Sequence, residues 1–377
     1  MKINYKVSLL VVIFFIIFVQ IPAAAKSGTS SFQTSVAQVI KLIPNDNKVI
    51  IKITSGPHKN RSITVSDFDN ETENNSTTSN TPKQTGLRIG DEVMVSINEN
   101  SDGTIKDAEI YDYVRYKYLY MLSLFFAALL IVLGGKKGIK SLATLLITGI
   151  AIIKIIIPFI MKGDSPVTIT VIVCIGLIII NLLIISGYNK KTLSAIIGTS
   201  LGLLSSGLIV FTVGNIMRST GINPDDAQVI SSVFGAQGFD FHGLFFCIML
   251  LSSLGAVMDI GISISSAMYE IENTNPNISN STLIKSGLNV GKDIMGTMCN
   301  TLILAFAGGI IITIITLSPY NLPFIEIINQ DIIASEILKA LSGSIGLILT
   351  IPITALTFAN VPTSLNKNKY RQPLNKS

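Results

Sequence analysis

The chain has 377 residues, of which 49% are hydrophobic and only 14% charged, and its formal net charge is +5. Because soluble globular proteins carry about 25% charged residues, this composition excludes that class. Several apolar runs reach the roughly 18 residues that a helix needs to cross a bilayer, so the sequence predicts an integral membrane protein.

The first predicted element is an apolar N-terminal segment, residues 1–25. Lys2 and Lys6 precede its hydrophobic run, and PAAAKSG follows it. The segment is expected to be either a signal peptide, with Ala23 and Ala25 at the cleavage site, or an uncleaved membrane anchor. Both alternatives place the next segment outside the cytoplasm.

The second element, residues 26–117, is polar and has the pattern of β structure. Its short runs are rich in Val, Ile and Thr and are bounded by Gly, Asn, Asp and Pro. The runs are SVAQVIKLI, KVIIKITSG, RSITVSDF, GDEVMVSINE and KDAEIYDYV, and NSDG before the last of them is typical of a hairpin turn. We expect a small extracytoplasmic all-β domain, barrel- or sandwich-like.

Residues 118–359 are predicted to form an α-helical polytopic membrane bundle, followed by a cytoplasmic basic tail, residues 360–377. Seven spans are expected, at about 118–134, 141–161, 167–187, 193–213, 243–264, 298–317 and 337–359. In the outer loop 214–243, the run DDAQVISSVFG predicts a short helix with its N-cap at Asp225. Gly198 and Gly202 have the spacing that is typical of close helix packing in membranes.

The distribution of basic residues predicts the orientation of the bundle. Thirteen Lys and Arg residues fall in segments expected to be cytoplasmic, whereas the short outer loops hold only Lys162 and Arg218. The thirteen are Lys2, Lys6, Lys136, Lys137, Lys140, Lys190, Lys191, Lys285, Lys292, Lys367, Lys369, Arg371 and Lys376. This bias predicts a multi-pass cell-membrane protein with its C-terminus in the cytoplasm, and it gives no reason to expect a nucleic acid partner.

One span, 243–264, contains a carboxylate in its inner third. Asp259 follows a long apolar run, and a charge at the middle of a membrane helix costs about 2.5–3.5 kcal/mol on insertion scales. Asp259, Ser263, Ser266 and Glu270 are separated by 4, 3 and 4 residues, so on a helix they share one face. The sequence therefore predicts a polar stripe on an otherwise apolar helix.

The next span repeats the pattern in SGLNVGKDIMGTMCNTLILAFAGG, where Asp293, Thr297 and Asn300 have the same spacing. Both helices meet at the inner leaflet, so Asp259 is expected at the depth of Thr297 or Asn300. One reading is an ion or substrate path lined by Asp259, Ser263, Thr297 and Asn300, with a cytoplasmic mouth formed by Glu270, Lys292 and Asp293. The other reading is that Asp259 is a buried packing group that fixes the helix register.

Other chemistry receives little support. Cys174, Cys247 and Cys299 lie in apolar runs with no metal-ligand spacing, His58 and His242 are far apart, and GLNVGKD lacks the spacing of a phosphate loop. No metal site and no cofactor are expected. No set of nucleophile, base and orienting residue is evident, so we do not expect an enzyme. Lys154, inside IAIIKIIIPFI, is expected to extend its amine toward the interface or to pair with a carboxylate.

The stretch GAVMDIGISISSAMYEI, followed by SGLNVGKDIMGTMCNTLILAFAGG, resembles the signature region of the YibE/F family of bacterial multi-pass membrane proteins. The resemblance extends from about Gly86 to Ala359, and it implies one N-terminal span, an outer β domain and a seven-helix bundle. It implies no activity.

Two functions remain open from the sequence. The first is a transporter or transport-associated permease for an unknown small solute or ion, coupled through Asp259. The second is a non-transporting membrane scaffold or sensor, whose β domain binds a partner or an envelope component. The expected partners are the lipid bilayer, a solute or ion, and either further copies of the chain or another membrane protein.

Overall fold

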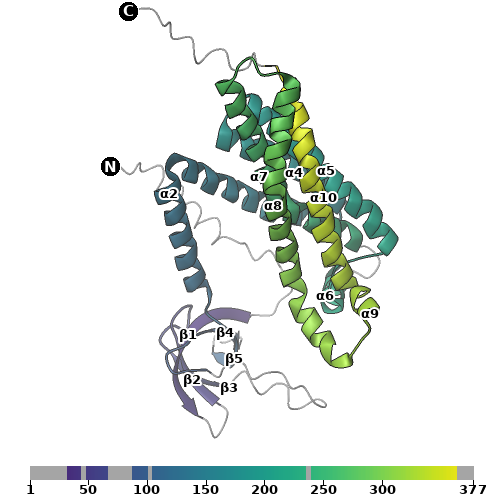
Figure 1. Ribbon diagram of the computed structural model, residues 1–377. Helices are drawn as coiled ribbons and strands as arrows, with labels where there is room; N and C mark the ends of the chain where they lie inside the picture. The colour runs from purple at the N-terminus through teal and green to yellow at the C-terminus, as the bar shows by residue number, and fades with distance from the viewer. Residues whose placement is uncertain (1–31, 44–47, 67–86, 101–103, 235–238, 363–377) are drawn as a thin grey trace, which may run out of the picture. The chain divides into compact units, whose positions relative to one another are not determined.

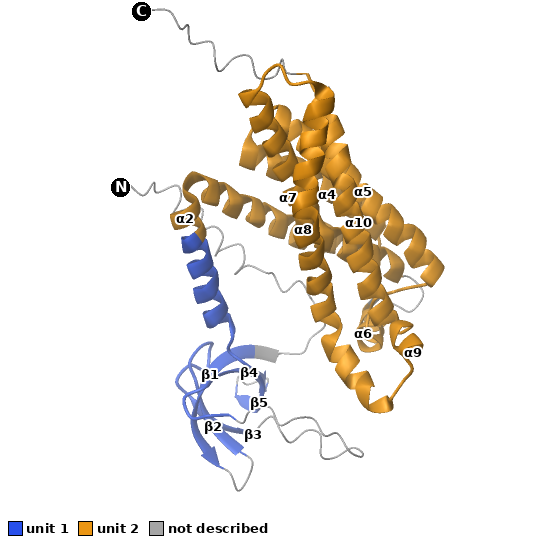
Figure 2. Cartoon of the chain, viewed as in Figure 1, with its two compact units in different colours: residues 1–129 blue, residues 130–377 orange. Residues whose placement is uncertain are grey.

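The computed structural model describes residues 32–43, 48–66, 87–100, 104–234 and 239–362 (Figure 1). The predicted N-terminal segment, residues 1–25, lies outside the described residues, as does most of the basic tail. The chain divides into two compact units, residues 1–129 and 130–377 (Figure 2).

The first unit contains a single antiparallel sheet of five strands, in the order β3-β2-β1-β4-β5. The strands are β1 (Phe32–Ile43), β2 (Lys48–Ile53), β3 (Ser62–Ser66), β4 (Glu92–Glu99) and β5 (Ile105–Tyr113), and each coincides with one predicted run. The two edge strands, β3 and β5, also contact one another. The sheet therefore curls toward a barrel, with the strand order of the five-stranded Greek-key barrel called the OB-fold.

Alternating side chains build the core of this barrel. Val49, Ile51 and Ile53 of β2 point inward, as do Val93, Val95 and Ile97 of β4, and all six are almost fully buried. This period of two is what an antiparallel sheet with one wet face requires. The backbone N–H of Asn100 donates to the Thr104 carbonyl at 2.8 Å and closes the β4–β5 hairpin at the predicted turn.

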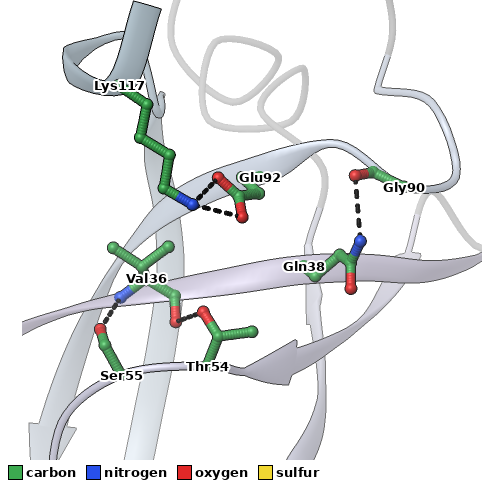
Figure 3. Close-up of polar contacts among 7 residues, drawn as sticks. All are labelled: Val36, Gln38, Thr54, Ser55, Gly90, Glu92 and Lys117. Atoms are coloured by element: carbon green, nitrogen blue, oxygen red, sulfur yellow. Dashed lines mark hydrogen bonds and ion pairs between the residues drawn. The ribbon is translucent and has the colours of Figure 1, made fainter. Parts of the chain in front are cut away.

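Polar contacts fasten the strands to one another and to the helix that follows (Figure 3). The Ser55 hydroxyl accepts from the Val36 N–H at 2.8 Å, and the Thr54 hydroxyl donates to the Val36 carbonyl at 3.0 Å. The Lys117 ammonium, in the first turn of that helix, donates to both carboxylate oxygens of Glu92 at 2.5 and 2.6 Å. These exposed groups position the helix start but contribute little stability.

Helices make up the second unit, and the first of them begins within the first unit. They are α2 (Tyr116–Ala151), which continues through the π-helix η3 (Ile152–Ile156) into α3 (Ile157–Met161), α4 (Pro166–Ser186), α5 (Lys190–Met217), α6 (Pro224–Phe234), α7 (Phe241–Thr274), α8 (Asn280–Leu317) and α10 (Asp331–Asn360). Two short elements, η4 (Ser318–Tyr320) and α9 (Phe324–Ile328), connect α8 to α10. Six helices among the described residues are long and apolar enough to cross a membrane.

The helix starts follow the usual capping chemistry. The Asn189 side chain accepts from the Thr192 N–H before α5, the Asp240 carboxylate from the Gly243 N–H before α7, and the Ser279 hydroxyl from the Thr282 N–H before α8. The predicted helix of the outer loop exists as α6, but it begins at Pro224, so Asp225 lies in the first helical turn and not at the N-cap. Proline explains this start, because its fixed φ suits the first helical position.

The first two predicted spans, 118–134 and 141–161, fall in one apolar stretch that breaks at Gly135. There the backbone leaves helical geometry, with φ 53° and ψ −129°, a region that favours glycine. About 19 helical residues precede the break and about 26 follow it, which correspond to roughly 28 and 39 Å. Each arm alone therefore matches or exceeds the roughly 30 Å of a hydrocarbon core.

Helices α5, α7 and α10 form the centre of the second unit, and glycines let them approach closely. A Cβ on Gly198 would strike the Thr354 side chain of α10, and one on Gly202 would strike the Thr350 hydroxyl and lie 3.0 Å from the Gly346 carbonyl. The prediction of close packing at Gly198 and Gly202 is confirmed. The interface carries hydroxyls too, since Ser206 donates to the Ser342 carbonyl at 3.1 Å.

We predict that Gly202→Ala lowers the free energy of unfolding by about 1–3 kcal/mol, because the added methyl group forces α5 away from α10. Gly149→Ala is the matched control, since a Cβ there meets nothing within 4 Å. Alanine is the better helix former, so the control is expected to be neutral or to gain up to about 1 kcal/mol. Unfolding of the purified variants in detergent measures both, and equal effects would contradict this account of the interface.

Candidate functional site

The predicted polar stripe lies on α7, on the side opposite the buried core. Asp259, Ser263 and Glu270 are exposed, as are Ser252 and Gly255 above them. The buried side of the same helix carries Val257, Ile260, Ile264 and Met268, each with an exposed fraction of 0%. The stripe thus faces away from the α5–α7–α10 centre.

The second stripe, on α8, is exposed as well. Asp293, Thr297 and Asn300 are exposed, and so is Lys292. The Thr297 hydroxyl donates to the Ile294 carbonyl of its own helix at 2.9 Å. Helix α8 packs on α7 and α10 through Gly287, which lies against Met268, and Gly291, which lies against Ile351.

No hydrogen bond or ion pair joins the two stripes within the described part of the chain. Asp259 has no hydrogen-bonding partner there, nor do Asn300 or Asp293. The structure thus places all seven predicted site residues on two adjacent helices without linking any of them. That they line a path stays a prediction.

Asp259 lies about 27 Å along α7 from Phe241, at 1.5 Å per residue. An ionised carboxylate at such a depth is costly unless a proton, a cation or a hydrogen-bond donor accompanies it. Lys154, in η3, is exposed too and pairs with no carboxylate of the described residues, so the predicted pairing is not seen.

Helix α10 contains an ion pair that the sequence did not predict. The Lys339 ammonium of α10 donates to the Glu336 carboxylate one turn earlier, and the side chains are only 8% and 20% exposed. Phe306 of α8 covers the ammonium, with its ring centroid 5.7 Å from Nζ. The run ASEILKAL contains the signal for this pair, because its acidic and basic residues are three apart and lie among mostly apolar residues.

A second buried pair ties three helices together. Lys190, at the start of α5, is 3% exposed, and its ammonium lies 2.7 Å from a carboxylate oxygen of Glu272 on α7. The same ammonium sits 4.6 Å from the ring centroid of Phe358 on α10. From the sequence, Lys190 was expected only as one of the cytoplasmic basic residues. In the structure its side chain is buried and forms an ion pair that joins α5 to α7.

At the opposite end of α5, Asp331 binds the loop that follows the helix. Its carboxylate accepts from the hydroxyls of Ser219 and Thr220, each at 2.6 Å, and from the backbone N–H groups of Thr220 and Gly221, each at 3.1 Å. This network fixes the start of α10 against the end of α5. The partners lie about 110 residues apart along the chain, so no local pattern indicates this network.

Comparison with known proteins decides the family. A family model described as YibE/F-like protein matches residues 122–363, well over half of the chain. The chain belongs to the YibE/F-like family. No curated protein and no solved structure matches it. The match confirms the resemblance, and the region it covers contains every residue of the two polar stripes and leaves out the five strands.

The described residues of this YibE/F-like protein contain no group of three or more His, Cys, Asp and Glu side chains that could hold a metal ion. The two stripes offer instead carboxylates, hydroxyls and one amide on exposed faces of two adjacent helices. These groups suit proton exchange and weak coordination of a monovalent cation.

We predict that Glu272→Gln lowers the free energy of unfolding by about 3 kcal/mol, since it leaves the Lys190 ammonium buried without a counter-charge. Glu270→Gln is the matched control, two residues away on the exposed face, and is expected to change stability by less than about 0.5 kcal/mol. Thermal or chemical unfolding of the purified variants compares them. A Glu272 variant as stable as the Glu270 variant would show that the pair does not hold the helices.

Proposed function

We propose that this YibE/F-like protein is a transporter or transport-associated permease for a small solute or ion, coupled to protons or another cation through Asp259. The observation that carries the proposal is the Asp259 carboxylate, which lies deep in an apolar helix and has no partner among the described residues. The ionised carboxylate is costly in that position unless a cation or another ligand accompanies it, and the neutral form requires a proton. The charge of Asp259 is therefore linked to binding, which is the property that coupling requires.

The proposed arrangement has seven spans after the β domain, with that domain outside the cell membrane and the C-terminus in the cytoplasm. The break at Gly135 supports two crossings within Tyr116–Met161, because each arm has the length of a span. Lys136, Lys137 and Lys140 follow the break, where the proposed arrangement has a cytoplasmic turn.

In this mechanism, protonation of Asp259 removes the charge at its position on the α7 face, and deprotonation creates a cation site. Ser263 lies one turn further along α7, and its hydroxyl supplies a second ligand oxygen for a cation held by Asp259. Thr297 and Asn300 on α8 supply a hydroxyl and an amide when the two stripes turn toward each other. Glu270, Lys292 and Asp293 form the cytoplasmic mouth of the path.

We predict that Asp259→Asn strongly lowers coupled flux but leaves assembly intact, because Asn has nearly the same volume and cannot ionise. Since hydrogen bonds to charged groups contribute about 1.5–3 kcal/mol, the flux is expected to fall about tenfold or more. Proteoliposomes screened with a panel of ions and small solutes measure the flux. Asp164→Asn, an exposed carboxylate between α3 and α4, is the control.

If Asp259 only fixes the packing of helices, the Asp259 variant keeps full flux or is lost as folded protein, and either result rejects the coupling role. Asp259→Glu sharpens the test, since it keeps an ionisable group and is expected to retain part of the flux.

A non-transporting scaffold or sensor is the second candidate, and one observation favours it. Both polar stripes are exposed on the single chain, as a surface for a partner helix would be. Deletion of residues 26–110 separates the candidates. We predict that the truncated protein keeps its flux when the bundle alone transports, whereas a scaffold that works through the β domain loses all function.

A further inference from the structure

A cavity of about 220 Å³ lies where α5 ends and α7 begins, apart from the two polar stripes. Its polar lining consists of Asn215, Ser219, Asp240 and His242, and its apolar lining includes Phe211 and Phe246. The volume is below the roughly 300 Å³ at which pockets for drug-sized ligands begin, so the cavity suits a small solute.

The His242 ring is held in a defined orientation. Its Nδ1 lies 2.9 Å from the Ser219 carbonyl oxygen, and because a carbonyl only accepts, Nδ1 carries the proton. In the neutral ring, Nε2 then has a free lone pair. Ser219 is itself fixed, since its hydroxyl donates to Asp331 at 2.6 Å.

Two more acceptors line the cavity. One oxygen of Asp240 accepts from the Gly243 N–H at 2.8 Å, while the other has no partner among the described residues. The Asn215 side chain has none there either. Asn215 also lies in the last turn of α5, where the helix dipole adds partial negative charge. No Lys or Arg side chain lines the cavity, and its carboxylate favours a cation.

The apolar wall is aromatic and ordered. The rings of Phe211 and Phe246 meet edge to face, with centroids 6.5 Å apart and an interplanar angle of 90°. Aromatic faces attract cations and accommodate hydrocarbon chains. A metal ion is the poorer fit, because the described residues offer no cluster of three ligands of the His, Cys, Asp and Glu type.

We propose that this cavity binds a small primary organic ammonium ion. Its three N–H groups donate to the free Asp240 oxygen, to Nε2 of His242 and to the amide oxygen of Asn215. Its alkyl chain lies against Phe211 and Phe246. Binding at this site is independent of the proposed transport and of Asp259, because the cavity contains none of the groups of the two stripes.

Equilibrium binding of n-butylammonium chloride to the purified full-length chain in detergent, measured by titration calorimetry, tests the proposal. We predict saturable binding that weakens about tenfold or more in Asp240→Asn. Asparagine is an equally good N-cap, so this variant removes the charge and preserves the start of α7. Asp225→Asn removes a charge in the first turn of α6 and is expected to bind as the unaltered chain does.

Two further probes separate the contributions. Butan-1-ol has the same chain without the charge and is expected not to saturate the site, and tetramethylammonium, which has no N–H donor, is expected to bind at least several-fold more weakly. His242→Phe keeps a ring but removes Nε2 and is expected to weaken butylammonium binding several-fold. If the Asp240 variant does not fold, the His242→Phe variant tests the binding site in its place.

Absence of saturable butylammonium binding overturns the proposal, and so does equal affinity in the Asp240, His242 and Asp225 variants. The Asp259→Asn protein is expected to bind butylammonium normally. Lost flux with intact binding therefore concerns the transport mechanism alone, and intact flux without binding rejects only this site.

Discussion

The close contact between α5 and α10 is the interaction on which the rest of the bundle depends. In lipid, the hydrophobic effect contributes little to the association of helices. Their association therefore depends on close approach of the backbones, which increases the dispersion energy. Gly198, Gly202 and Gly346 permit that approach. The Thr350 hydroxyl bonds back to the Gly346 carbonyl of its own helix at 2.8 Å, and Ser206 bonds across to α10, whereas the buried Thr354 hydroxyl has no hydrogen-bonding partner among the described residues.

The charged side chains around this contact are paired. The Lys190–Glu272 pair closes one end of α5, and the Asp331 network closes the other. The Glu336–Lys339 pair is shielded by Phe306. Each of these charges has a partner at hydrogen-bonding distance. Asp259 has no such partner among the described residues. Its carboxylate therefore does not stabilise the fold through a hydrogen bond, as the other charged groups do.

The sequence was sufficient where the decisive information is local. Periodicity predicted the five strands, apolar length predicted the helices, and the spacing of Gly198 and Gly202 predicted a close contact. It was insufficient where a residue's environment depends on a distant element. Nothing near Lys190 reveals Glu272 and Phe358, and the partners of Asp331 lie in another loop. For the candidate site, spacing placed Asp259 and Ser263 on one helix face, but it did not indicate that this face points away from the core.

The bend at Gly135 has a topological consequence. Helix α2 leads from the β domain into residues 130–377, and each arm of the helical stretch 116–161 is long enough to cross a membrane. With two crossings there, the spans after the β domain are odd in number, and the C-terminus lies across the membrane from that domain. With one crossing, every later loop changes sides. In the proposed arrangement, the backbone conformation at Gly135 therefore sets the number of crossings, and with it the side of the membrane on which the ends of α5, α7 and α10 lie.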